Sequence, residues 1–350
     1  MGKKACPTNT STSVLTRRRF LSSVATGTAG MAWLAEKTPP AFAQQRSFAA
    51  RFGVVAAATH VVGIADKFFC DEANKRSGGA LQIQFFPDGQ IGASRDLVEG
   101  VQLGTVQFCS VAGANITPFL SDMLVFDLPY VFTDTSGLLK FLDGPVGSQT
   151  LAVERFGTLK MRGLSWYDSG TRNMYNSRKP IHSPDDLKGM KIRVEENPVR
   201  IASLNAMGAQ ATPMAFTEVY GALQQKVVDG AENSVQGYMT TKHFEVAPFF
   251  SITDHFINLD VILVSTAFFN GLPKELQDLL IQVGKDTAAY ERSIFGQGTA
   301  KLMNDMKGLG IKVNDADKKA FQATVGKVHQ EYAKRVPKDW WDMVMKAAGL

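Results

Sequence analysis

The chain has 350 residues, which is enough for two domains that each bury a core of their own. Its hydrophobic fraction of 45% and charged fraction of 20% are those of an ordinary globular protein. No window approaches the roughly 18 apolar residues of a membrane helix, so we expect the mature protein to be soluble and not embedded in a membrane.

The formal net charge of +5 comes from the first part of the chain. Residues 1–43 hold six of the 38 bases and one of the 33 acids, which leaves 32 of each and a formal charge of zero. The basic balance therefore gives no argument for a nucleic-acid partner.

Residues 1–43 are predicted to be a twin-arginine signal peptide. Thr16-Arg17-Arg18-Arg19-Phe20-Leu21 matches the export pattern, and a weakly apolar run follows it. Ala41-Phe42-Ala43 then offers small residues for cleavage before Gln44. The alternative is a disordered basic arm. We expect export to the periplasm.

Cys70 and Cys109 are the cysteines that remain after the signal peptide, since Cys6 leaves with it. The periplasm permits a disulfide. Both residues lie on apolar stretches, however, which favours two separate buried thiols.

The first part of the mature chain alternates between strand and helix patterns. Gly78-Gly79 closes the first helix, and Ser94 is a good N-cap for the second. Such alternation predicts a parallel sheet covered by helices. The expected strands are 52–58, 81–85 and 105–111, and the expected helices are 61–73 and about 94–103.

A second α/β unit begins near Ser165. The later elements are expected to include a half-buried strand at 189–194, a second short strand at 227–233 and a helix at 235–246. Strands at 254–264 are followed by a long helix from Pro273 to about Met306, a strand at 311–313 and a last amphipathic helix through 321–332.

Arg193 is the decisive residue of the strand at 189–194. Ile192 and Val194 flank it, so its side chain points to the opposite face of the strand. A guanidinium cannot lose its proton, and one placed in a cleft needs an anionic partner. The alternative is a solvated arginine beside surface carboxylates.

The segments "GMKIRV", "PMAFTEVYGALQ" and "VVDGAENS", in this order and spacing, resemble the solute-binding proteins of TRAP transporters, the DctP-type family. "FPDGQIGASRDLVEGVQLGTVQF" and "VFDLPYVF" resemble its first-domain segments. The resemblance implies a periplasmic binding protein fold: two α/β lobes joined by a hinge and braced by a long helix. The implied lobes are 46–169 plus 259–298, and 170–258 plus 299–350.

The resemblance also implies four ligand-binding residues. Arg193 would form a salt bridge with a ligand carboxylate, and Arg172, in "SGTRNMY", would be a second arginine that reaches the ligand. Asn233 would hydrogen-bond the carboxylate end, and Phe216 would pack on the ligand. Without the motifs, Asn233 reads equally well as a turn residue and Phe216 as a core residue.

The chain departs from the sialic-acid branch of the family at Val55, Ser94, Ala112 and Glu196, where that branch uses polar residues to hold sugar hydroxyls. We therefore expect small or moderately hydroxylated acids to be preferred over sialic acid.

The expected function is capture of an organic acid, either a sugar acid or a C4-dicarboxylate or hydroxy acid, and its delivery to the TRAP membrane subunits. One alternative is a periplasmic ligand sensor for a receptor kinase. The other is an exported enzyme, but no glycine-rich dinucleotide loop, metal-spaced Cys/His cluster or nucleophile elbow is present. We expect no catalytic residues, cofactor or metal.

Overall fold

A mixed sheet of nine strands organises the part of the chain that the structure, a computed structural model, describes: residues 47–132 and 135–348, together with Gly2. The strand order is β2-β1-β3-β8-β4-β7-β5-β6, and β9 pairs with β8 outside that path. The strands are β1 (Phe48–Val54), β2 (Leu81–Phe86), β3 (Phe108–Ala112), β4 (Met161–Asn176), β5 (Lys191–Val194), β6 (Gln210–Pro213), β7 (Gly230–Asn233), β8 (Phe249–Ser265) and β9 (Lys312–Asp315).

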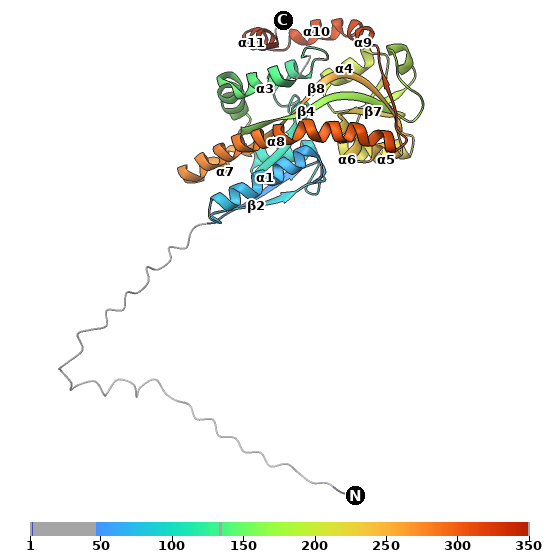
Figure 1. Cartoon of the computed structure of the whole chain (residues 1–350). Coiled ribbons are helices and arrows are strands. Elements are labelled where there is room, and N and C mark those ends of the chain that lie inside the picture. The colour runs from blue at the N-terminus through green and yellow to red at the C-terminus, as the bar shows by residue number, and fades with distance from the viewer. Residues whose placement is uncertain (1, 3–46, 133–134, 349–350) are drawn as a thin grey trace, which may run out of the picture. The chain divides into compact units, whose positions relative to one another are not determined.

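Helices fill the connections between these strands (Figure 1). The α-helices are α1 (Val61–Arg76), α2 (Ser94–Leu103), α3 (Thr135–Asp143), α4 (Pro198–Ala206), α5 (Val219–Gln224), α6 (Val235–Thr240), α7 (Thr266–Asn270), α8 (Lys274–Gly308), α9 (Lys318–Thr324), α10 (Gly326–Ala333) and α11 (Lys338–Ala348). The shorter or irregular helical segments are η1 (Gly113–Asn115), η2 (Ser121–Asp127), the π-helical η3 (Val146–Arg155), η4 (Pro184–Leu187), η5 (Phe216–Glu218) and η6 (His243–Glu245).

Each half of the sheet is built from parallel strands. β1 pairs in parallel with β2 and β3, and β5 pairs in parallel with β6 and β7. β4 and β8 lie antiparallel between the two halves. The parallel sheet predicted for the first part of the chain is therefore confirmed by β1, β2 and β3, whereas β4 and β8 run antiparallel to each other and to β7 and β3.

The joining strands β4 and β8 are long, at 16 and 17 residues. Their pairing shifts register between Asp168 and Thr171 and again between Arg172 and Met174, and Gly170 adopts a φ of +78° there. A shift of this kind bends and twists a strand. Two of the lobe limits that the sequence predicts, 169/170 and 258/259, fall within these two strands, and the third, 298/299, falls within α8. Those limits stay a prediction.

Helix α8 runs along both halves of the sheet, and in Figure 1 it extends from α7 past α1 toward α6. Pro273 precedes its first turn, as predicted. Gly284 lies so close to β4 that a Cβ atom there would come within 2.5 Å of the Leu164 carbonyl oxygen. The predicted bracing helix is therefore confirmed, and it packs tightly on the sheet.

Three predicted helix details are wrong. The helix expected at 235–246 is shorter, because α6 ends at Thr240 and η6 follows it as a separate segment. Ser94 is the first residue of α2, and Ala93 holds the N-cap position, because the Asp96 carboxylate accepts the Ala93 N–H at 2.9 Å. The last amphipathic helix is two helices, α9 and α10, which meet at Val325. The apolar spacing continues across that break, so the spacing did not reveal it. Helix α11, which follows Pro337, was not predicted.

Cys70 in α1 and Cys109 in β3 are both buried and unbridged, as predicted. The predicted signal peptide, apart from Gly2, lies outside the described residues. Within those residues, no helix combines the length and the apolar character needed to cross a membrane.

Candidate ligand-binding site

A cleft lies where the two halves of the sheet meet. It brings together all four residues that the sequence predicts for ligand binding, and they come from β4, β5, β7 and η5. The cleft also includes Val55, Ser94, Ala112 and Glu196, the departures from the sialic-acid pattern. Its wall is formed in part by Val55, His60, Ser94, Ala112, Asn115, Arg172, Arg193, Glu196, Met214, Phe216, Asn233, Gly237, Asn258 and Asp260.

Arg193 lies on β5 and is only 2% exposed. Its Nε and Nη2 donate to the Met214 carbonyl oxygen at 2.9 and 2.7 Å, and the guanidinium lies 5.8 Å from the centre of the Phe216 ring. Among the described residues no carboxylate oxygen lies within 4.0 Å of it. Burial lowers the pKa of Arg193, and the nearby carboxylates of Glu195 and Glu232 oppose that shift. Such a buried cation favours an anionic ligand.

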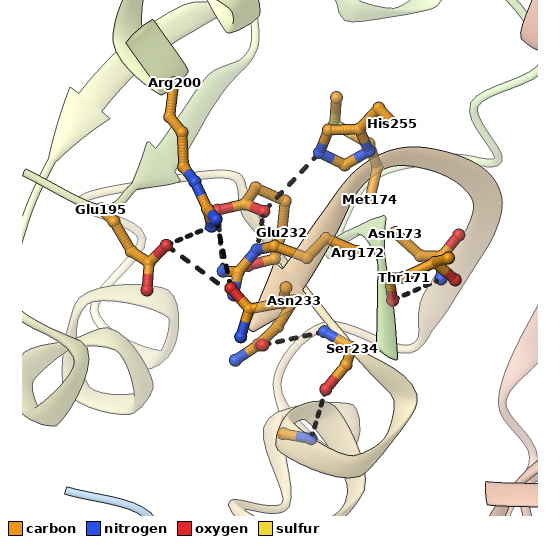
Figure 2. Close-up of polar contacts among 12 residues, drawn as sticks. Thr171, Arg172, Asn173, Met174, Glu195, Arg200, Glu232, Asn233, Ser234 and His255 are labelled. Carbon is orange, nitrogen blue, oxygen red and sulfur yellow. Dashed lines mark hydrogen bonds and ion pairs between the residues drawn. The ribbon is translucent and has the colours of Figure 1, made fainter. Parts of the chain in front are cut away.

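Arg172 lies on β4 and already has partners in the protein (Figure 2). Its Nε is ion-paired with the Glu232 carboxylate, and its Nη2 donates to Oε1 and to the backbone oxygen of Glu232 at 2.9 and 2.8 Å. Burial opposes ionisation of Glu232, but Arg172 and the His255 ring outweigh it and lower the pKa of the carboxyl. Arg172 therefore brings little uncompensated charge to the cleft.

A third arginine, Arg200 of α4, lies next to this pair (Figure 2). It is ion-paired with Glu195, and its Nη2 lies 3.2 Å from an oxygen of Asp127. Nη2 also donates to Oδ1 of Asn258 at 3.1 Å. Arg172 and Arg200 are thus matched by carboxylates, whereas Arg193 is not.

Asn233 ends β7 and turns its amide into the cleft. Its Oδ1 accepts the Ser234 N–H at 2.8 Å, which leaves Nδ2 without a protein partner among the described residues. A Cβ atom at Gly237 would lie 2.5 Å from that Nδ2, so the glycine leaves room for the amide. The Ser234 Oγ accepts the Gly237 N–H, as Figure 2 shows, and this bond fixes the start of α6 below the asparagine.

His60 caps α1 and also forms part of the cleft wall. Its Nδ1 accepts the Val62 N–H at 3.1 Å, so the proton of the neutral ring lies on Nε2. Burial lowers the pKa of His60 to about 4, which keeps the ring neutral at pH 7. The ring therefore offers an uncharged donor.

Asp260 of β8 adds an acid to the same region of the cleft. Burial raises the pKa of Asp260 to about 6. Val55 and Ala112 line the wall without polar groups, and Glu196 is exposed. Asp260 and Glu196 are acidic, unlike Arg172 and Arg193 of the same cleft. They suit ligand hydroxyl groups better than a second ligand carboxylate.

The comparisons with known proteins decide the family. Residues 52–335 match the DctP family, described as "Bacterial extracellular solute-binding protein, family 7". The chain belongs to this family. It is 34% identical over 290 residues to the 2,3-diketo-L-gulonate-binding periplasmic protein YiaO of Escherichia coli, which covers 82% of this chain and 88% of the relative. It is 32% identical to the C4-dicarboxylate-binding periplasmic protein DctP of Rhodobacter capsulatus, over 77% of this chain and 81% of the relative.

Solved structures of the family agree with the fold. A TRAP periplasmic solute-binding protein from Sulfitobacter sp. NAS-14.1, with bound β-D-galacturonate, is 32% identical and has a TM-score of 0.82, covering 85% of this chain and all of that one. The sugar acid binding protein DctPAm from Advenella mimigardefordensis, in complex with galactonate, is 29% identical with a TM-score of 0.83, covering 87% of this chain and 98% of that one. The fold of this DctP-family protein is thus the two-lobed periplasmic binding protein fold, and its role is solute binding for a TRAP transporter.

Sequence reasoning missed three residues that shape the site: Glu195, Arg200 and Glu232. Glu232 lies within the segment "VVDGAENS" and is fully buried, yet only its neighbour Asn233 was singled out. An acid inside a short apolar strand was the available signal, because buried acids are rarely unpaired. The pairing of Arg172 with Glu232 joins residues 60 positions apart, and no local pattern shows it.

Proposed function

We propose that this protein binds a sugar acid with one carboxylate, a hexuronate or an aldonate, in the periplasm and delivers it unchanged to the membrane subunits of a TRAP transporter. The observation that carries the proposal is Arg193, a fully buried arginine on the cleft wall that has a carbonyl partner but, among the residues that the structure describes, no carboxylate partner. A ligand carboxylate supplies the missing charge, and the planar guanidinium can hold it through two bonds.

Two other groups support the same end of the ligand. The unpartnered Nδ2 of Asn233 can donate to a carboxylate oxygen, and the Phe216 ring can pack on the carbon skeleton. The Nη1 of Arg172, which lies 3.8 Å from the Glu195 carboxylate, is the atom of that guanidinium with the weakest protein contact. Arg172 should therefore contribute less to ligand affinity than Arg193, through Nη1.

Other groups of the cleft wall favour hydroxyl groups over a second carboxylate. Asp260 and Glu196 would repel one, and Arg95, another cation of the cleft wall, pairs with Glu99 at 2.9 Å. His60 and Asn115 can exchange hydrogen bonds with hydroxyls. The structural neighbours whose ligands are galacturonate and galactonate support this choice of ligand class. The alternative ligand class, a C4-dicarboxylate, is supported by the similarity to the Rhodobacter capsulatus relative.

Calorimetry tests the role of Arg193. D-galacturonate, D-glucuronate, galactonate and succinate are titrated into the wild type, Arg193→Lys and Arg193→Ala. Removing one partner of a buried charge pair costs about 3–5 kcal/mol. The affinity of Arg193→Ala for sugar acids should therefore be lower than that of the wild type by about two orders of magnitude or more. Arg193→Lys should also fail, because a point charge does not reproduce the two-pronged contact.

Arg178→Lys is the matched control, because Arg178 is an exposed arginine paired with Asp229 and lies outside the cleft wall. It should leave the affinity unchanged. Near-normal binding by Arg193→Lys would contradict the two-pronged contact. Tighter binding of succinate than of all three sugar acids would contradict the proposed ligand class.

A further inference from the structure

A second cleft, separate from the ligand-binding cleft, lies between α3, η3, β4 and α8. It has a volume of about 320 Å³ and shares no wall residue with the ligand-binding cleft. Ligand pockets of this size are common, and their walls are mostly apolar with a few polar groups. We call it the α8 cleft, and its wall includes Asp143, Arg162, Ser165, Trp166, Ile281 and Lys285.

The cleft stays open because two elements leave room there. The face of α8 that borders it carries Gly284, Ala288 and Ala289, which have little or no side chain. Opposite, Gly163 pairs with Leu263 and Ser165 with Ile262, so Leu164 is an extra residue that makes a β-bulge in β4. Bulges of this kind redirect side chains and are frequent beside functional sites.

Arg162 gives this cleft an unmatched positive charge. No carboxylate of the described residues lies within 4.0 Å of it, and none of its guanidinium nitrogens has a hydrogen-bond partner among them. Its Nε is enclosed, so the terminal nitrogens are the donors left for the cleft. The guanidinium lies 4.8 Å from the centre of the Phe269 ring, which holds it in place without neutralising it.

Other groups of the cleft point to the same kind of ligand. The Oγ of Ser165 is buried and has no hydrogen-bond partner. Lys285 is exposed at the border of the cleft and makes no ion pair within the described residues. Arg292 is ion-paired with Asp143, so that acid does not neutralise Arg162. The positive charge of the wall thus exceeds the negative charge.

We propose that the α8 cleft binds an amphiphilic carboxylate, with its charged group at Arg162 and its apolar chain or ring against Trp166, Ile281 and the alanines of α8. The apolar wall selects for the body of the ligand, because burying apolar surface is favourable in proportion to its area. Inorganic phosphate has the charge but not the apolar body, so it should bind poorly. The proposal is independent of the sugar acid proposed for the other cleft.

Octanoate is the probe, and calorimetry on the purified mature protein is the test. Because octanoate could also reach Arg193, it is titrated into the wild type and into Arg193→Ala, where its affinity should be the same. Arg162→Gln should weaken binding at least ten-fold, and Ala289→Phe, which fills the cleft from an exposed position, should abolish it. Lys301→Gln, on an exposed part of α8 outside the cleft, is the matched control and should bind as the wild type does.

Thermal unfolding of each variant, together with the galacturonate affinity of the Arg162, Ala289 and Lys301 variants, shows whether the fold is kept. Binding that survives in Arg193→Ala and is lost in both α8-cleft variants supports the proposal. Three results would overturn it: no octanoate binding to the wild type, loss of binding in Arg193→Ala, or unchanged binding in Ala289→Phe. Phosphate that binds as tightly as octanoate would contradict the amphiphilic class.

Discussion

Three arginines near the ligand-binding cleft differ in their partners. Arg172 and Arg200 are held by Glu232, Glu195 and Asp127, whereas Arg193 makes hydrogen bonds to a carbonyl oxygen. The charge of a buried arginine that is paired inside the protein is already compensated. Burial of an unpaired arginine is unfavourable until an anionic ligand binds to it. This difference makes Arg193 the residue on which ligand affinity should depend most.

Glu232→Gln tests the structural role of the paired arginines. Glu232 has no exposed surface, and the substitution leaves Arg172 buried without its carboxylate. Breaking one side of a buried pair costs about 3–5 kcal/mol, so the free energy of unfolding at pH 7, measured in urea, should fall by about that amount. Glu196→Gln is the control, because this exposed glutamate of the cleft wall should change stability by less than about 0.5 kcal/mol. Equal stability of the two variants would contradict the role of Glu232.

The sequence predicts a residue of the site when the segment around that residue is recognisable on its own. Arg193, Arg172, Asn233 and Phe216 lie within recognisable segments, and the structure brings all four to one cleft. The partners that distinguish Arg172 from Arg193 come from other strands and helices, and only the folded sheet brings them together. The same holds for Arg162 and the α8 cleft: its charge stands out only in the fold, where Asp143 pairs with Arg292 and no carboxylate of the described residues lies within 4.0 Å of Arg162.

At the scale of elements, the start of α6 supports the binding amide. Gly237→Ala would place a Cβ atom 2.5–2.8 Å from the amide atoms of Asn233, so the asparagine must move. The affinity for D-galacturonate should fall at least ten-fold by calorimetry. Gly221→Ala, in α5 with nothing within 4 Å of its new Cβ, should leave affinity unchanged. In an Asn233→Ala background Gly237→Ala should add little; full additivity would contradict the proposed coupling.

Helix α8 carries a buried acid, Glu291, against β4. Its Oε2 accepts the Asp168 N–H at 3.2 Å, while Oε1 has no partner. Burial, aided by the nearby Asp168 carboxylate, raises the pKa of Glu291 from 4.5 to about 8. The folded protein therefore keeps a proton that the unfolded chain releases above pH 4.5. The stabilisation is full below that pH and is lost as the pH rises through about 8.

Glu291→Gln should remove this pH dependence. From pH 5 to 8.5 the free energy of unfolding of the wild type should fall by a few kcal/mol more than that of the variant, at about 1.4 kcal/mol per pKa unit. Denaturant unfolding across this pH range measures it. Glu275→Gln, an exposed glutamate of the same helix, should behave as the wild type does. Parallel curves for the wild type and Glu291→Gln would mean that the acid is ionised in the folded protein.

At the scale of the whole molecule, the order of elements was predictable and the continuity of the sheet was not. Strand and helix periodicity locates the parallel units on either side. Nothing in the periodicity of β4 and β8 shows that each runs through both halves, because polar residues such as Asp168 in β4 and Asp254 in β8 interrupt the apolar pattern of these strands. The register shifts near Gly170 are visible only in the pairing, and they lie where the predicted lobes meet.

Ligand binding should close the cleft, because the ligand contacts both lobes. Arg193 and Asn233 come from β5 and β7, while Ser94 and Ala112 come from α2 and β3. A ligand favours the closed state only through contacts that the open state lacks, and groups on both walls provide such contacts. The register shifts in β4 give the joining strands a place to bend.

Small-angle scattering should therefore show a smaller radius of gyration at saturating D-galacturonate. Arg193→Ala at the same ligand concentration should show no change, which separates binding from a solvent effect. An unchanged curve for the wild type, with binding confirmed by calorimetry, would instead indicate a rigid cleft that takes up its ligand without lobe movement.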